Sequence, residues 1–188
     1  RIRAVTDDAG LPLPAFLIGW KIPKRRSSEY NALYLAGNLL YDGESSRLYQ
    51  KLVKGEESII QLFGFTDERR GPSSIYVGAI PKPEKGLSKI RDVIMIEIAH
   101  IAKEGPTADE MQKLHNQLIN DFVRLRQSSQ ARAQAIAEFA LYDGDPELIN
   151  TELETLLAIT REQIRAAAEE YLHSDNRSLL DIVPAGKG

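Results

Sequence analysis

Cysteine is absent from this 188-residue sequence. Its absence excludes disulfides, thiolate zinc ligands and a cysteine nucleophile, and it fits an oxidising compartment as well as a reducing one. No apolar run approaches the roughly 20 residues that a membrane helix needs, so no membrane span is predicted. The first residue is Arg1 rather than Met, which indicates a fragment of a longer polypeptide, and the lack of a targeting sequence therefore says little.

An excess of positive charge is also missing. The chain has 24 Lys and Arg residues against 27 Asp and Glu, a formal net charge of −3, and no long basic run. A nucleic-acid-binding domain normally carries a basic patch or stripe. The charge balance therefore argues against nucleic acid as a partner.

Histidine is scarce and scattered. The closest pair among the three histidines is His100 and His115, fifteen residues apart and separated by the Gly105-Pro106 break. A zinc site on a helix needs two histidines three or four residues apart. We therefore predict no metal site in this chain, with His100 and His115 on polar helix flanks and His173 near a helix end.

No pattern for nucleophilic or phosphate chemistry is present. Ser45-Ser46 stands at a helix start, where serine is a normal cap, and no Gly-x-Ser-x-Gly elbow surrounds it. "GNLLYDGESS" lacks the Gly-Lys-Ser/Thr ending of a phosphate loop. The carboxylate pairs Glu56-Glu57 and Glu169-Glu170 are best explained by solvated surface. We predict no catalytic residue.

One cluster of cations surrounds Pro23. It consists of Lys21, Lys24, Arg25 and Arg26. A solvated loop is the favoured interpretation. The alternative is a contact for an acidic partner or peptide.

The periodicity predicts one α+β domain over residues 1–188, about 70% of whose surface would be buried on folding. Helices are expected to cover one face of a mostly antiparallel sheet. The expected strands are 2–6, 15–22, 58–65, 73–80 and 177–183. The expected helices are 28–41, 45–53, 87–103, 107–142 with a bend at 128–129, 146–157 and 160–172.

Two helix starts have a capping box. Thr107 is followed by Glu110, and Thr160 by Gln163, so that each pair can satisfy two backbone donors of the first turn. In the helix that begins near Leu87, five apolar residues share one face and are expected in the core: Ile90, Val93, Ile94, Ile98 and Ile101.

Five phrases in order resemble the C-terminal, non-zinc domain of the M16 peptidases, the pitrilysin, insulinase and mitochondrial-processing-peptidase family. They are "LPAFLIGWKIP", "GESSRLYQKLV", "HIAKEGPTADEMQKLHNQL", "TELETLLAITREQIRAAAEEYL" and "NRSLLDIVPAG". The resemblance spans almost the whole chain, and the predicted order of elements agrees with the two-layer fold of that family.

The resemblance also implies what this chain should lack. In the family, an N-terminal domain holds zinc with His-x-x-Glu-His and a distant Glu, and the Glu of the motif acts as general base; the motif does not occur here. The C-terminal domain of active members adds an Arg and a Tyr that orient substrate and stabilise the oxyanion. Counted from Arg47, those positions are Val53 and Ile60, whose side chains can neither orient a substrate nor stabilise an oxyanion. Arg47 and Tyr49 stand at the wrong offsets to replace them.

The resemblance therefore implies a non-catalytic domain of a zinc metallopeptidase that forms part of an enclosed chamber and contacts peptide substrate. Zinc is expected in an upstream domain, and the Arg/Tyr pair on a partner subunit, as in two-subunit bacterial members. The family favours the bacterial periplasm or envelope. The alternative is a structural scaffold or binding subunit without peptidase activity.

A third hypothesis is a binding module. In it, the helical face of Leu114, Leu118 and Leu125 recruits a partner protein. Apolar residues at this spacing are more often core.

Overall fold

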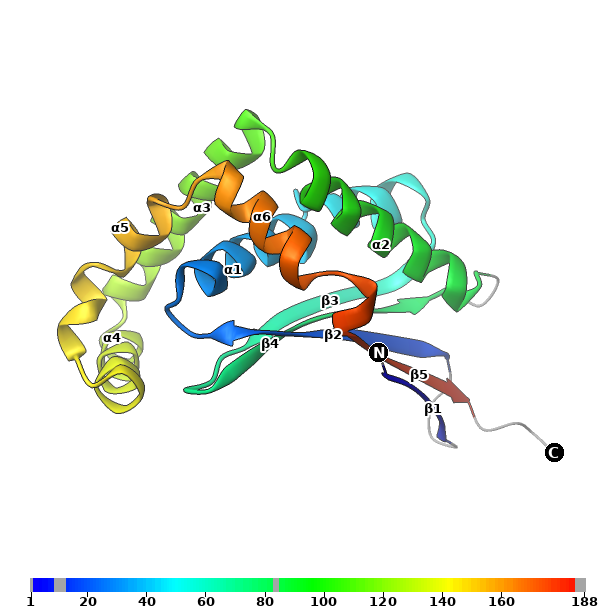
Figure 1. Cartoon of the computed structure of the whole chain (residues 1–188), viewed down its shortest axis with the longest axis horizontal. Coiled ribbons are helices and arrows are strands. Elements are labelled where there is room, and N and C mark those ends of the chain that lie inside the picture. Colours follow the sequence, from blue (N-terminus) through cyan, green and yellow to red (C-terminus); the bar gives the residue numbers. More distant parts are fainter. Residues whose placement is uncertain (1, 9–12, 83–84, 185–188) are drawn as a thin grey trace.

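A five-stranded sheet forms the base of the domain in the computed structural model, which describes residues 2–8, 13–82 and 85–184 (Figure 1). The sheet order is β1-β5-β2-β4-β3, with β1 and β5 parallel and every other pair antiparallel. The strands are β1 (Ile2–Asp8), β2 (Ala15–Lys24), β3 (Ile59–Asp67), β4 (Pro72–Pro81) and β5 (Arg177–Pro184). All five predicted strands are present, and the mostly antiparallel α+β fold is confirmed.

The main helices lie over one face of this sheet, as Figure 1 shows. They are α1 (Ser28–Tyr41), α2 (Leu87–Glu104), α3 (Ala108–Gln127) and α6 (Arg161–Tyr171). A smaller group, α4 (Ser129–Glu138), η2 (Phe139–Asp143) and η3 (Pro146–Asn150), continues past the end of the sheet. We call residues 129–150 the arm. The short α5 (Glu152–Leu157) leads back from it to α6.

The core lies between the sheet and the helices. Alternate β2 residues Phe16, Ile18 and Trp20 are almost fully buried, as expected for the covered face of a pleated strand. The antiparallel register places them beside Ala79, Val77 and Ile75 of β4. All five predicted core residues of α2 are buried above them.

Both predicted capping boxes are confirmed. The Thr107 hydroxyl accepts from the Glu110 N–H, and the Glu110 carboxylate accepts from the Thr107 N–H. Thr160 and Gln163 make the same reciprocal pair at α6. These local hydrogen bonds explain why the two helices begin where the sequence predicts.

Three helix predictions need correction. The helix expected over 45–53 is the π-helix η1 (Tyr49–Gly55), whose last turn is closed by the Glu56 N–H on the Lys51 carbonyl. Beyond it, the Ser58 N–H and hydroxyl both donate to the Leu52 carbonyl. The expected bend in 107–142 is a full break, because Ser128 leaves helical geometry and caps α4 by accepting from the Ala131 N–H. The helix expected over 146–157 is two pieces, η3 and α5, joined at Thr151.

The proposed partner-recruiting face of α3 belongs mainly to the core. Leu114 and Leu118 are buried against the other helices, and Leu125 is half-buried. The core interpretation is therefore confirmed for the first two. Within residues 2–8, 13–82 and 85–184, no helix has the length and apolar content needed to cross a bilayer.

Candidate functional site

The positions that the M16 resemblance assigns to Arg and Tyr lie on η1 and β3. Val53 is half-buried on η1 and packs against the core. Ile60 is 53% exposed and lies at a bulge between Ile59 and Gln61 of β3. Hydrocarbon side chains can neither donate a hydrogen bond nor carry charge. That this chain supplies no substrate-orienting pair stays a prediction.

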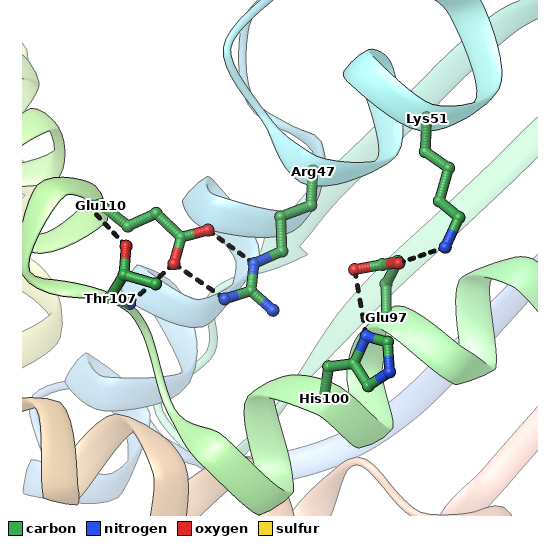
Figure 2. A network of polar contacts seen from close by, with 6 residues as sticks. All are labelled: Arg47, Lys51, Glu97, His100, Thr107 and Glu110. Atoms are coloured by element: carbon green, nitrogen blue, oxygen red, sulfur yellow. Dashed lines mark hydrogen bonds and ion pairs between the residues drawn. The ribbon is translucent and has the colours of Figure 1, made fainter. Parts of the chain in front are cut away.

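The residues just before η1 are fixed to α3 by an arginine. Arg47 donates from Nε to Glu110 Oε1 at 2.6 Å and from Nη2 to Oε2 at 2.8 Å. This planar two-bond pair is the strong form of an ion pair. Figure 2 shows the Thr107–Glu110 cap beside it, so one carboxylate serves both the helix cap and the arginine. Arg47 thus ties the residues before η1 to α3, and the prediction that it does not replace the catalytic Arg stays a prediction.

A second ion pair fixes η1 to α2. Lys51 Nζ lies 2.7 Å from Glu97 Oε1, and His100 Nδ1 lies 3.7 Å from Glu97 Oε2. Glu97 is buried, whereas Lys51 and His100 reach it from the surface (Figure 2). The two pairs, Arg47–Glu110 and Lys51–Glu97, hold the segment before β3 to the helices on both sides of the Gly105-Pro106 break.

The pKa shifts of Arg47 and Glu110 show that each group favours the charged form of the other. The hydrogen bonds to Glu110 raise the pKa of Arg47 above its usual range. Desolvation by itself would raise the pKa of Glu110, but the hydrogen bonds from Arg47 and Thr107 together outweigh it, and that pKa is lowered. Both groups therefore stay charged at neutral pH.

We expect Glu110→Gln to lower the free energy of unfolding by about 1–2 kcal/mol at pH 7, because it weakens a charge-assisted pair and a cap. The pKa of Glu110 is depressed in the folded state. The stabilisation is therefore present above its unfolded value, near 4.5, and disappears as pH falls through the folded pKa. Urea denaturation from pH 7 to pH 3 measures this. A gap between wild type and variant that persists unchanged at pH 3 would contradict it.

The histidines do not come together. Among the residues that the structure describes, no group of three or more His, Asp or Glu side chains could hold a metal ion. His100 lies beside the carboxylate of Glu97. His173 follows α6 and accepts from the Asp175 N–H through Nδ1.

The favoured interpretation of the Pro23 cation cluster is wrong for its two arginines. The Arg25 side chain is only 10% exposed; it lies 3.1 Å from Asp143 and 3.4 Å from Glu68. Arg26 pairs with Glu152. Both guanidinium groups also lie over the Phe139 ring, a favourable cation–π position. The arginines attach the arm to the β2–α1 turn, while Lys21 and Lys24 stay exposed.

The sequence-based predictions did not include an apolar surface on the sheet face that points away from the helices. No helix of the described residues covers it, as Figure 1 shows, yet its middle is aromatic. Phe65 and Tyr76 stack with ring centroids 4.8 Å apart. Phe63 lies over Gly78 and Tyr76 over Gly19, where an added Cβ would come within 2.3 Å and 2.7 Å of the rings. The glycines thus let the rings lie flat on the sheet.

Aliphatic side chains extend this aromatic surface. The register places Leu17 beside Gly78 of β4 and beside Leu180 of β5, and Ile80 and Ile182 lie on the same face. An antiparallel sheet with one face in water usually alternates apolar and polar residues. The signal was present in the adjacent apolar residues of "LFGF" and in the "LL" and "IV" pairs of "SLLDIV", because neighbouring residues of a strand point to opposite faces.

Comparison with known proteins agrees with this architecture. The family model described as "Peptidase M16 inactive domain" matches residues 1–118. A protease from Helicobacter pylori superposes with a TM-score of 0.90 at 22% identity, over 97% of this chain and 44% of that one. The inactive peptidase domain of a candidate zinc protease from Bordetella parapertussis gives 0.82 at 22% identity, over 97% of this chain and 96% of that one. No curated protein matches.

The fold and the element order define a two-layer α+β domain of the type seen in these protease structures. The chain belongs to the Peptidase M16 inactive domain family. It spans less than half the length of the H. pylori protease and nearly all of the B. parapertussis domain.

Proposed function

We propose that this chain is the non-catalytic C-terminal domain of a zinc metallopeptidase, that it forms part of the wall of a chamber, and that it contacts peptide substrate there. Residues 1–188 act as one domain, with the zinc-binding domain upstream on the same polypeptide and the Arg/Tyr pair on a partner subunit. The candidate zinc proteases among the similar structures support this assignment.

The uncovered sheet face is the observation that carries the proposal. An aromatic and aliphatic surface facing water is unusual for a sheet, and contiguous apolar surface marks a site that contacts another molecule. The outer edge of β3 adds to it, because among the described strands β3 pairs with β4 alone. An unpaired strand edge can pair with an extended chain, so an unfolded peptide is a fitting ligand.

A bacterial envelope location belongs to the same proposal. The periplasmic protease PqqL from Escherichia coli superposes with a TM-score of 0.77 at 14% identity, over 98% of this chain and 20% of that one. That likeness supports the fold, and the location is carried by the family resemblance.

The test uses the full-length protein with and without its partner subunit, measuring bound zinc and cleavage of an unstructured peptide. We expect bound zinc, and cleavage only when the partner is added. Phe65→Ser should then raise KM about threefold or more with zinc content unchanged, because it removes apolar contact area. Ile96→Ser on the exposed side of α2 is the matched control, since both side chains are 48% exposed.

Two outcomes would contradict the proposal in different ways. No zinc and no cleavage in either state would leave the scaffold or binding role. Cleavage that Phe65→Ser and Ile96→Ser change equally would show that the uncovered sheet face does not contact the peptide.

A further inference from the structure

The strand ends beside the arm carry two cations without a partner. Lys24 at the end of β2 and Arg70 in the β3–β4 turn are both exposed, and neither has a carboxylate within ion-pair distance in the described parts of the chain. The sheet register brings them together, because Lys24 lies beside Pro72. Figure 1 shows the β3–β4 turn and the end of β2 at the same end of the sheet as α4.

These two cations line one open hollow. It has a volume of about 390 Å³ and is also lined by Arg25, Arg26 and Ser27 of the β2–α1 turn and by Tyr142, Asp143 and Leu148 of the arm. Arg25 and Arg26 are held by Asp143, Glu68 and Glu152. These three carboxylates exceed the two arginines by one negative charge, so the site is positive, with a net charge of +1, only because of Lys24 and Arg70.

The lining also has an apolar part. Tyr142 is 44% exposed, with the Arg25 guanidinium 5.4 Å from its ring centroid. Leu148, which lines the same hollow, is half-buried. A carboxylate side chain could place its anion between Lys24 and Arg70 and its methylene groups on Tyr142. The site therefore matches a glutamate or aspartate better than a nucleic-acid backbone, which would need a longer basic track.

We propose that this hollow binds acidic side chains of a peptide, so that the domain prefers peptides carrying Glu or Asp. The preference is local. The whole chain has a net charge of −3, and its long-range field favours basic peptides. An observed preference for acidic peptides must therefore come from a site such as this one. The identity of the ligand as a peptide rests on the proposed function.

The experiment measures binding of two labelled unstructured peptides to the 188-residue chain by fluorescence anisotropy. One peptide contains several glutamates, and the other has glutamine in their place. Each exposed ion pair adds only a modest amount of binding energy, but the acidic peptide forms two of them. We therefore expect it to bind about five- to tenfold more tightly than the glutamine peptide at low salt. The advantage should shrink as ionic strength rises.

The double variant Lys24→Gln with Arg70→Gln should abolish this advantage. Lys89→Gln with Lys103→Gln on α2 is the matched control, because it removes the same charge at two exposed positions outside the hollow, and it should keep the advantage. Equal binding of both peptides, or equal loss in both double variants, overturns the inference while leaving the proposed function standing. Binding of neither peptide overturns both.

Discussion

Gly78→Ala should destabilise the domain by about 3 kcal/mol, at the upper end of the usual cost of overpacking. A Cβ at this position would lie 2.3 Å from the Phe63 ring and 2.6 Å from the Phe16 carbonyl oxygen. The ring could swing away, but the carbonyl belongs to the neighbouring strand β2, so the sheet itself must shift. Urea denaturation measures the change as a lower midpoint at an unchanged slope.

Gly71→Ala is the control for this substitution. Gly71 lies in the β3–β4 turn, and an added Cβ would meet no atom within 4 Å. We expect a change of at most about 0.5 kcal/mol, as for other surface positions. Equal stability of the two variants would show that the sheet accommodates a methyl group at Gly78 without strain.

Arg91→Ala should cost a similar amount, about 3 kcal/mol, because it removes one partner of a buried ion pair. Arg91 of α2 pairs with Asp181 of β5, and the Asp181 side chain is only 4% exposed. The arginine also lies over the Phe16 ring, with 5.8 Å between the guanidinium carbon and the ring centroid. Its loss leaves a carboxylate in the core without this guanidinium and removes packing on the sheet. Denaturant unfolding at pH 7 measures the loss.

Two further variants separate charge from helix propensity. Lys89→Ala, two residues earlier on the exposed side of α2, should leave stability within about 0.5 kcal/mol of wild type. Replacing both partners, Arg91→Leu with Asp181→Leu, should recover much of the loss, because a well-packed apolar pair can replace a buried ion pair. A double variant no more stable than Arg91→Ala would argue against a charge effect.

Local patterns were sufficient for most of the architecture. The capping pairs at Thr107 and Thr160 act within one helical turn, so the sequence predicts where α3 and α6 begin. The apolar face of α2 and the alternation of β2 likewise depend on side-chain periodicity alone. The prediction failed where local signals compete: Ser128 looks like a bend inside a helix but caps a new one, and η1 ends with a π turn in which the Glu56 N–H donates to the Lys51 carbonyl.

That Val53 and Ile60 stand where active members have Arg and Tyr could be predicted from sequence because the resemblance supplies the spacing. The roles of the charged residues could not. The sequence alone favours a solvated loop for Arg25 and Arg26. The fold places Asp143 and Glu152 beside them, although these two residues are more than a hundred positions away in the chain. Glu97 and Asp181 are of residue types that normally lie at the surface. Only their ion pairs with Lys51 and Arg91 explain why they are buried.

Helix starts, strands and the covered face of the sheet follow from short-range hydrogen bonding and side-chain period, which act over a few residues and can therefore be read along the chain. Ion pairing, the aromatic surface over Gly19 and Gly78, and the hollow between Lys24, Arg70 and the arm depend on distances between segments remote in sequence. Only the tertiary structure sets those distances, because the energy of a charge or an exposed ring depends on what the packed chain places within a few ångströms of it.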